Sequence, residues 1–187
     1  MKGFGASGKG VQIGKLIQSM DPRGFQVFPI KAETEDERMH PFLWRFWTKT
    51  PEAGRIAIFD GSWYRKVLID RFEKRTREKE IETAFHSIEA FEKQLTDGGT
   101  ILVKLLLDID QKEQKKRFEK LLEKKETAWR VSQGDRERNA KYSEYAAMME
   151  EVLYRSDTKS APWTVIEATD RQFCDSKDLY DGDPCTC

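Results

Sequence analysis

The chain contains 187 residues, a length typical of one domain that buries its own core. Lys plus Arg number 33, as do Asp plus Glu, so the formal net charge is zero, which excludes a wholly basic nucleic-acid-binding protein. Aromatic residues make up 11%, too many for a disordered chain. Because no apolar run approaches the ~20 residues needed to cross a bilayer and no signal segment is recognisable, we expect a cytoplasmic protein without membrane contact.

Four short apolar runs are typical of buried strands. Each follows a segment that contains Gly or Pro, and together they cover residues 25–30, 55–60, 100–108 and 163–168. Near-continuous apolar runs with such flanks suit strands that are buried on both faces.

Helical periodicity marks the segments between and around these runs. We expect helices over residues 10–20, 34–48, 80–96, 110–125 and 138–154. The second begins with the capping-box sequence Thr34-Glu35-Asp36-Glu37. Strands that alternate with helices predict an α/β domain with a mainly parallel sheet in a three-layer arrangement.

A candidate phosphate loop precedes the first helix. Residues 3–10 read GFGASGKG and fit the pattern G-x-x-x-x-G-K. Glycines let successive N–H groups turn toward phosphate oxygens, the helix N-terminus adds partial positive charge, and Lys9 adds a mobile cation. The Ser or Thr that usually follows and holds Mg²⁺ is here Gly10. The alternative is an ordinary glycine-rich turn before a helix.

A second signal is the acidic residue that ends the 55–60 run. A carboxylate at the carboxyl end of a strand can reach Mg²⁺ or its waters, which makes Asp60 a candidate metal ligand. Alternatively, Asp60 ends the strand and caps a turn.

In these and further segments, the sequence resembles the polyphosphate kinase 2 family, in particular its polyphosphate:AMP phosphotransferase branch. The resemblance covers residues 3–173. Its landmarks are Gly8-Lys9-Gly10, Asp21-Pro22-Arg23-Gly24, Phe42-Leu43-Trp44-Arg45, GRIAIFDGSWY at residues 54–64, Val67-Leu68-Ile69-Asp70-Arg71, residues 113–118, Trp129-Arg130-Val131-Ser132 and Ser160-Ala161-Pro162-Trp163.

The resemblance implies a phosphate-loop kinase fold with a helical lid at about residues 110–154. It implies Mg²⁺-dependent phosphoryl transfer between inorganic polyphosphate and AMP or ADP. In that reaction Lys9 would hold the transferring phosphates, Asp60 would hold the metal, and Arg117 would close over the substrate from the lid. We expect a domain over residues 1–173 and an irregular tail over residues 174–187, which contains all three cysteines.

Two departures from the family pattern bear on activity. The family loop carries an Asp at the position of Gly5, and the family's D-R-S-x-Y motif has an Arg at the position of Gly61. With an N-terminal strand that looks truncated, these departures make the chain similar to the degenerate half of a two-domain family member. We therefore expect a homo-oligomer or a pairing with a second kinase-like domain.

Cations near the expected site are candidates for binding a polyanion electrostatically. The predicted phosphate-binding set is Gly3, Gly8, Lys9, Gly10, Lys15, Arg45, Arg65, Lys66, Arg71 and Arg130. An ordinary solvated surface is the alternative for any one of the cations, and an exposed helix with i,i+4 ion pairs is the alternative for residues 110–125.

Three functions remain open at this point. The first is a polyphosphate-dependent nucleotide phosphotransferase, and the second is a catalytically impaired scaffold or polyphosphate-binding domain of the same family. The third, a nucleoside monophosphate kinase that uses ATP, is disfavoured because Gly10 replaces the hydroxyl residue.

Overall fold

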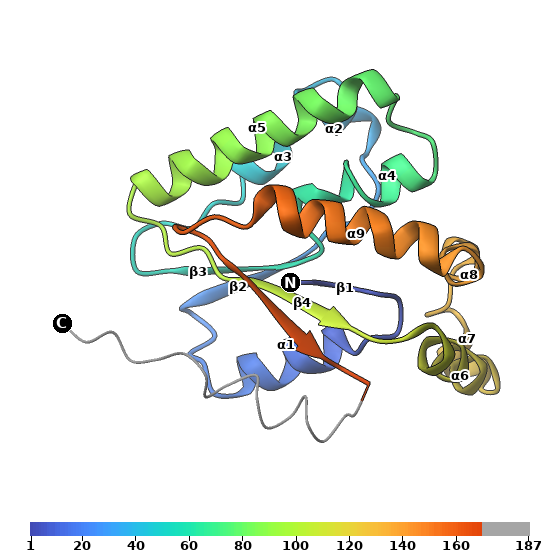
Figure 1. The fold of residues 1–187 in the computed structure, drawn as a ribbon. Helices are drawn as coiled ribbons and strands as arrows, with labels where there is room; N and C mark the ends of the chain where they lie inside the picture. Colours follow the sequence, from blue (N-terminus) through green and yellow to red (C-terminus); the bar gives the residue numbers. More distant parts are fainter. Residues whose placement is uncertain (170–187) are drawn as a thin grey trace. The chain divides into compact units, whose positions relative to one another are not determined.

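The computed structural model describes residues 1–169 (Figure 1). These residues fall into two compact units. Unit 1 comprises Met1, Met20–Lys104 and Ser143–Trp163. Unit 2 comprises Lys2–Ser19, Leu105–Tyr142 and the described residues from Thr164 onward. The predicted tail over residues 174–187 lies outside the described residues.

Unit 2 is built on a three-stranded sheet in the order β1-β4-β5. Its strands are β1 (Lys2–Gly3), β4 (Lys104–Asp108) and β5 (Trp163–Glu167), of which the first residues of β4 and β5, Lys104 and Trp163, belong to unit 1. β1 runs parallel to β4 with Gly3 opposite Leu107, and the arrows of β4 and β5 point the same way in Figure 1. The carboxyl ends of these strands therefore meet at one edge of the sheet, where the phosphate loop begins.

Helices complete unit 2. They are α1 (Lys9–Gln18), α6 (Gln111–Leu122), α7 (Lys125–Ala128) and α8 (Gln133–Ala140). The predicted start of the 110–125 helix is confirmed, because the Asp110 carboxylate caps α6 by accepting a 2.8 Å hydrogen bond from the Glu113 N–H. The core of unit 2 contains buried Phe4, Ile13, Leu106, Leu107, Ile109 and Phe118.

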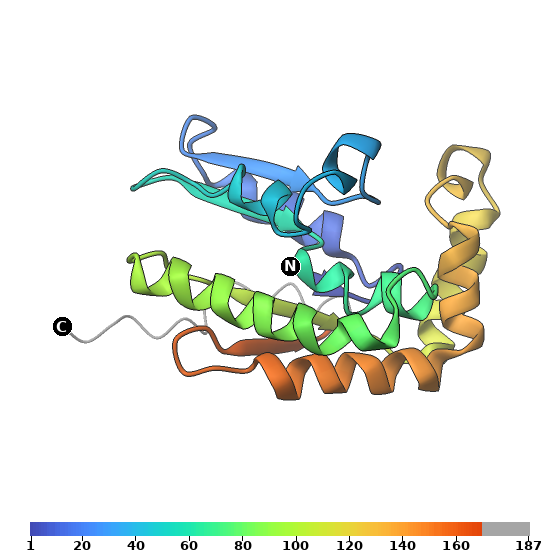
Figure 2. The same ribbon diagram turned by 90° about the horizontal axis from the view of Figure 1, so that it is seen from above.

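Unit 1 pairs β2 (Phe25–Pro29) with β3 (Ile56–Asp60) in parallel. Its long helices, α5 (Glu78–Asp97) and α9 (Tyr142–Ser156, of which Tyr142 belongs to unit 2), run side by side in Figures 1 and 2. The shorter helices are α2 (Glu35–Arg38), α3 (Trp44–Trp47), the 3-10 helix η1 (Trp63–Arg65) and α4 (Ile69–Phe72).

Two helices expected as single pieces are divided in the structure. The 34–48 segment forms α2 and α3, because Pro41 between them has no N–H to donate and disfavours helical geometry at the residue before it. Its capping box at Thr34 is confirmed, with both reciprocal hydrogen bonds present. The 138–154 segment divides between α8 and α9, since Lys141 leaves helical geometry with ψ of 42°.

The α/β class with parallel strand pairs is confirmed, but the hydrogen bonds divide the strands between a three-stranded and a two-stranded sheet. The expected strand over residues 100–108 is shorter, because Ile101 and Val103 are exposed and only Lys104–Asp108 pairs. Among residues 1–169, no helix has the length and apolar character needed to cross a membrane.

Candidate functional site

The phosphate loop, residues 3–10, connects β1 to α1 in unit 2. Gly8 lies at the N-cap of α1 with φ of 100°, and its carbonyl accepts hydrogen bonds from the N–H groups of Val11 and Gln12. No side chain caps α1, and its first turn carries no acidic residue. The helix N-terminus therefore presents N–H groups and the positive end of its dipole, which is the arrangement that binds phosphate.

The Lys9 ammonium lies against the loop's own backbone. Its Nζ is 3.1 Å from the carbonyl oxygens of both Gly3 and Phe4, and the residue is half-buried. Both acceptors are neutral, so a phosphate oxygen forms a stronger, charge-assisted hydrogen bond with the same group. This geometry keeps a cation at the phosphate loop.

Arg117 of α6 ties the phosphate loop to the end of β5. Its Nη1 donates to the Ala6 carbonyl at 3.2 Å, and its Nη2 donates to the carbonyls of Ala168 and Thr169 at 2.7 and 2.9 Å. Its Nε pairs with Glu113 at 2.8 Å, and the side chain is only 6% exposed. The guanidinium therefore fixes the position of the loop.

A second support reaches the loop through Gln114, which is fully buried in α6. Its amide Nε2 donates to the Gly5 carbonyl at 3.0 Å, and its Oε1 accepts from Asn139 of α8 at 2.8 Å. Through this chain of hydrogen bonds, α6 and α8 are both linked to residue 5.

Asp135 of α8 also belongs to this part of unit 2. Its Oδ2 accepts from the N–H and hydroxyl of Ser132, and its Oδ1 accepts from the Arg138 guanidinium at 2.8 Å. Burial favours the neutral acid, but the hydrogen bonds from Ser132 and Arg138 outweigh it, so the pKa of Asp135 lies below its ordinary value. Asp135 is therefore ionised at neutral pH.

In unit 1, Asp60 ends β3 and is half-buried. It lies opposite Pro29 in the parallel register, and its carbonyl accepts from the Ile30 N–H. Gly61 follows with φ of 82°, a conformation that strains any L-residue. The backbone itself therefore accounts for glycine at position 61.

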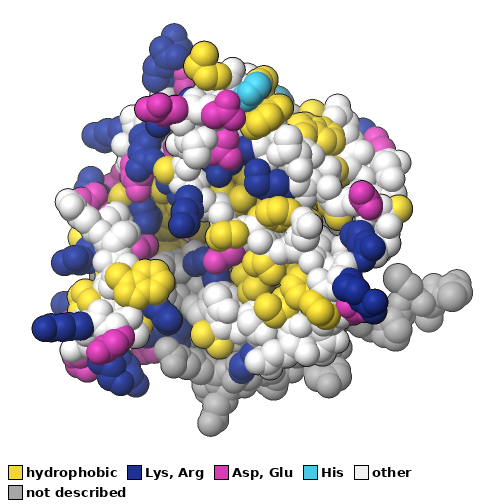
Figure 3. Space-filling view, turned by 180° about the vertical axis from the view of Figure 1, so that it is seen from behind, with side chains coloured by type: hydrophobic (Ala, Val, Ile, Leu, Met, Phe, Trp, Pro, Cys, Tyr) yellow, Lys and Arg dark blue, Asp and Glu magenta, His cyan; other side chains and the backbone are white. Residues whose placement is uncertain are grey.

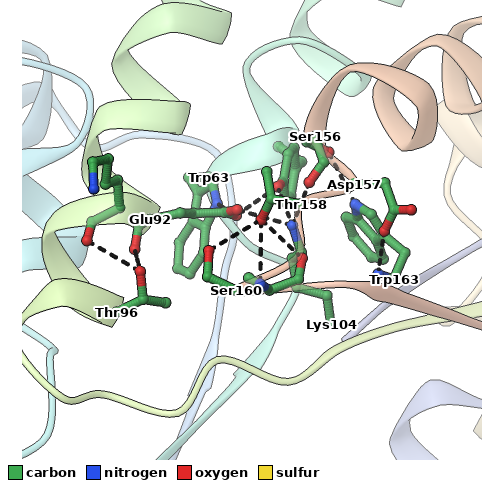
Figure 4. A network of polar contacts seen from close by, with 12 residues as sticks. Trp63, Glu92, Thr96, Lys104, Ser156, Asp157, Thr158, Ser160 and Trp163 are labelled. Atoms are coloured by element: carbon green, nitrogen blue, oxygen red, sulfur yellow. Dashed lines mark hydrogen bonds and ion pairs between the residues drawn. The ribbon is translucent and has the colours of Figure 1, made fainter.

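A buried polar network holds the turn that follows Asp60 (Figure 4). Glu92 of α5 accepts from Trp63 Nε1 at 2.8 Å and from the Tyr64 hydroxyl at 2.5 Å. The Lys104 ammonium donates to Glu92 at 2.9 Å and to the Ser156 carbonyl at 2.5 Å. Burial and the Glu92 charge raise the pKa of Tyr64, which stays neutral and donates. The network fixes η1, which carries Arg65.

The arginines of unit 1 that were predicted to bind phosphate are engaged with carboxylates. The closest pairs are Arg45 with Glu37 at 3.2 Å, Arg65 with Asp70 at 3.3 Å, and Arg71 with Glu151 at 2.6 Å. A polyanion would have to compete with these acids for the arginines of unit 1.

Unit 1 contains an open cavity of about 820 Å³. Both signs of charge line it, with Arg38, Lys66 and Arg75 opposed by acidic side chains, and His40 and Phe42 supply aromatic surface. Its volume is in the range of small-molecule sites. Burial raises the pKa of Asp70 in its wall against the opposing effects of Arg65 and Arg75.

The structure groups the predicted site residues into two sets. Unit 2 holds Gly3, Gly8, Lys9, Gly10, Lys15, Arg117 and Arg130, and unit 1 holds Arg45, Asp60, Arg65, Lys66 and Arg71. Arg130 is exposed, and its guanidinium lies 5.5 Å from the centre of the Trp129 ring. On the face shown in Figure 3, Lys and Arg side chains are interspersed with Asp and Glu.

Sequence reasoning missed four residues that shape these regions: Glu92, Lys104, Gln114 and Asp135. Glu92 and Lys104 do carry a signal, because each is a charged residue inside an apolar pattern. Glu92 lies between Phe91 and Leu95, and Lys104 lies within the apolar run at residues 100–108. For Asp135 the S-x-x-D spacing from Ser132 indicates a capping box. Nothing local marks Gln114.

Comparison with known proteins agrees with this geometry. The family model described as Polyphosphate kinase 2 (PPK2) matches residues 1–179. The chain belongs to the polyphosphate kinase 2 family. It is 37% identical to the polyphosphate:AMP phosphotransferase of Pseudomonas syringae pv. tomato over 95% of this chain and 36% of that protein. The corresponding Pseudomonas aeruginosa protein is 36% identical with the same coverage.

A solved polyphosphate kinase 2 structure from Arthrobacter aurescens TC1 matches with a TM-score of 0.86 at 34% identity. That match covers 92% of this chain and 61% of the solved one. The chain thus spans about a third of the length of the two curated Pseudomonas relatives, and the family's phosphate-loop kinase-like fold is the fold seen here.

Proposed function

We propose that this chain is a polyphosphate-handling domain of a polyphosphate-dependent nucleotide phosphotransferase that uses AMP or ADP. The observation that carries the proposal is the phosphate loop, in which an uncapped helix N-terminus and Lys9 provide an anion site. The names of the relatives support polyphosphate and a nucleotide as the two substrates.

In the proposed reaction, an oxygen of the acceptor nucleotide's phosphate forms a bond to the terminal phosphorus of polyphosphate. The bridging P–O bond breaks, and the shortened polyphosphate leaves with the electron pair. The protein contributes position and charge rather than covalent chemistry. Lys9 and the α1 N-terminus hold the phosphates, while Arg117 keeps the loop in place as a positioning residue.

Mg²⁺ is the divalent ion we propose for this reaction. Among residues 1–169, no group of three or more His, Cys, Asp or Glu side chains is arranged to hold a metal. Mg²⁺ is commonly bound by one or two carboxylates together with substrate phosphates. Asp60 is the proposed carboxylate in unit 1; the bound ion would neutralise phosphate charge.

The cavity of unit 1 is the proposed place for the acceptor nucleotide. Its cations suit a phosphate, and His40 and Phe42 offer aromatic surface to a base. We further propose a cytoplasmic location and association with a second copy or a second kinase-like domain.

The test is a phosphotransfer assay of the purified chain with AMP, polyphosphate and Mg²⁺, read by chromatographic separation of ADP. We expect ADP to form and Lys9→Met to abolish it, with Lys79→Met, which removes an exposed lysine of α5, as the charge-matched control. Polyphosphate binding measured in parallel by calorimetry separates binding from catalysis. A chain that neither binds polyphosphate nor makes ADP contradicts the proposal.

A second function, polyphosphate binding without transfer, is favoured by one observation. The φ of 82° at Gly61 suits glycine and would strain the arginine that the family motif carries at this position. Losing such an arginine costs ~10³-fold or more in the rate of phosphoryl transfer. Tight binding of polyphosphate by calorimetry, with no ADP formed in the phosphotransfer assay, would favour this second function.

A further inference from the structure

The cavity of unit 1 has a wall of mixed charge around its volume of about 820 Å³. The charged residues that line it are three cations and three acids: Arg38, Lys66, Arg75, Glu33, Asp70 and Glu80. A wall in which the two signs are equal in number attracts a long polyanion far less than a basic channel does. The charges that remain uncompensated therefore decide what the cavity binds.

Two of the acids are already paired with arginines. The Asp70 carboxylate lies 3.3 Å from Arg65 Nε. Glu80 accepts a 2.6 Å hydrogen bond from Arg77, which lies just before α5. The pKa of Glu80 lies below its ordinary value chiefly because of that hydrogen bond, and the charge of Lys66 contributes least. The arginines thus occupy carboxylates that could otherwise neutralise Lys66.

Lys66 is a half-buried cation of the wall that lacks such a partner. Its backbone is fixed, because its N–H donates to the Trp63 carbonyl at the end of η1 and its carbonyl accepts from the Thr76 hydroxyl at 3.1 Å. Its ammonium neither donates a hydrogen bond nor forms an ion pair with any residue between 1 and 169. A half-buried ammonium without a partner gains a strong, charge-assisted hydrogen bond when an anion enters the cavity.

The other two cations of the wall differ from each other in the same respect. Arg75 pairs with Asp70 at 3.7 Å and also with Glu73. Arg38 is exposed at the end of α2, and its guanidinium has no ion pair within the described part of the chain. Lys66 and Arg38 therefore leave two positive charges open to the cavity. A phosphate monoester carries a charge of about −2 near neutral pH, which these two cations match.

We propose that Lys66 contacts the phosphate of the acceptor nucleotide in this cavity, and that the acceptor is a nucleoside monophosphate rather than a longer phosphate chain. Arg38 supplies the second positive charge from α2. Glu33, a half-buried acid with no partner among the described residues, accepts hydrogen bonds from hydroxyl or amino groups of the nucleoside and repels further phosphates. This inference rests on the proposed function, and it assigns Lys66 to the acceptor instead of to polyphosphate.

The competing explanation is a solvated lysine that lines the cavity without binding anything. Lys79 of α5 provides the matched control, because it is exposed and is not among the residues that line the cavity. Replacing either lysine by Met removes one positive charge and keeps a side chain of similar length. The two variants differ in nucleotide binding only if Lys66 contacts the nucleotide.

The experiment titrates the full chain by calorimetry with AMP, with ADP and with polyphosphate in separate runs, so that no turnover occurs. The unmodified chain should bind AMP more tightly than ADP. We expect Lys66→Met to weaken AMP binding about tenfold, because a charge-assisted hydrogen bond is lost, and to leave polyphosphate binding unchanged. Lys79→Met should change neither. Equal AMP affinity in the two variants overturns the inference, as does a tighter binding of ADP than of AMP.

A charge-retaining variant keeps the inference falsifiable if Lys66→Met is poorly folded. Lys66→Arg preserves the positive charge and should bind AMP with nearly the affinity of the unmodified chain, whereas Lys66→Gln should bind it as weakly as Lys66→Met. Thermal unfolding without ligand reports whether each variant is folded. Folded Arg and Gln variants with the same AMP affinity contradict the inference.

The outcomes separate this inference from the proposed function. If the unmodified chain binds neither polyphosphate nor AMP, the proposed function fails and the inference fails with it. If the chain makes ADP from AMP and Lys66→Met binds AMP as the unmodified chain does, only the inference fails. If Lys66→Met loses polyphosphate binding and keeps AMP binding, Lys66 belongs to the polyphosphate site and the inference is wrong.

Discussion

Two lysines, one in each unit, lie in different surroundings. Lys104 in unit 1 is 4% exposed and lies 2.9 Å from the Glu92 carboxylate. Lys9 in unit 2 is half-buried and donates to two neutral carbonyls of the phosphate loop. Taking Lys104 away from Glu92 would leave a buried carboxylate unpaired, which makes Lys104 a structural cation, whereas Lys9 lies on the phosphate loop itself. The location of each lysine, in a buried ion pair or on the phosphate loop, therefore separates the structural cation from the proposed binding cation.

The largest expected effect comes from breaking the pair in unit 1. Glu92→Leu should lower the free energy of unfolding by about 3–5 kcal/mol, because it leaves the Lys104 ammonium buried without its carboxylate. Urea unfolding followed by circular dichroism measures the change. Glu89→Leu, at an exposed position of the same helix, is the control and should stay within about 0.5 kcal/mol. A cost for Glu92→Leu no larger than the control's would show that the network is not structural.

Backbone geometry near the network predicts the next effect. Gly61→Arg should destabilise the chain by about 1–2 kcal/mol, since φ of 82° is unfavourable for any residue with a Cβ. Thermal unfolding is the measurement. Gly14→Ala in α1 has neither a positive φ nor a neighbour within 4 Å of the new Cβ, and it should raise stability by up to about 1 kcal/mol. An Arg at position 61 that costs nothing would mean the turn relaxes to another conformation.

In unit 2 the same comparison predicts a change in binding with little change in stability. Lys9→Met should weaken polyphosphate binding at least about tenfold, which is ~1.4 kcal/mol, and should flatten the salt dependence by about one unit of slope. Its free energy of unfolding should fall by less than that of Glu92→Leu, because Lys9 is half-buried whereas the Lys104–Glu92 pair is buried. Calorimetric titrations at two salt concentrations and urea unfolding measure both quantities. A large stability loss with intact binding would reverse the roles assigned to Lys9 and Lys104.

The smallest expected effect is a pH dependence. Asp135 has a lowered pKa in the folded chain, so the unfolded state binds more protons as the pH falls toward about 4, and the stabilisation by Asp135 is lost in that range. Above the unfolded pKa this stabilisation is fully present. Comparing the unmodified chain with Asp135→Asn by urea unfolding at pH 7, 5 and 3.5 should show a difference that shrinks with acidity. A difference that is constant with pH would place the pKa of Asp135 at its ordinary value.

Local patterns predicted much of the fold and the phosphate loop, because their causes are local. Each of these features depends on residues a few positions apart: the glycines and Lys9 of residues 3–10, the capping box at Thr34 and the apolar face of α5. Partners distant in sequence were not predictable in this way. Arg117 bonds carbonyls more than 50 and 100 residues away, and no spacing in the chain indicates which side chain lies beside Gly5.

The departure at Gly5 illustrates the difference. Read along the sequence, it is a carboxylate missing from the family pattern. Seen in the structure, it is a position whose space Asp135 and Phe118 already fill. A substitution that restores the family residue therefore has to be accompanied by a change in α8.

The hydrogen bonds of Arg117 have a consequence for where chains of this family can be cut or joined. Two of its three carbonyl partners, Ala168 and Thr169, lie just beyond the last paired residue of β5. A boundary drawn at the end of that strand removes these acceptors and leaves a buried guanidinium with unmet donors beside the phosphate loop. A linker to another domain therefore has to start after residue 169. A shortened chain likewise has to retain Ala168 and Thr169 if Arg117 is to hold the phosphate loop in position.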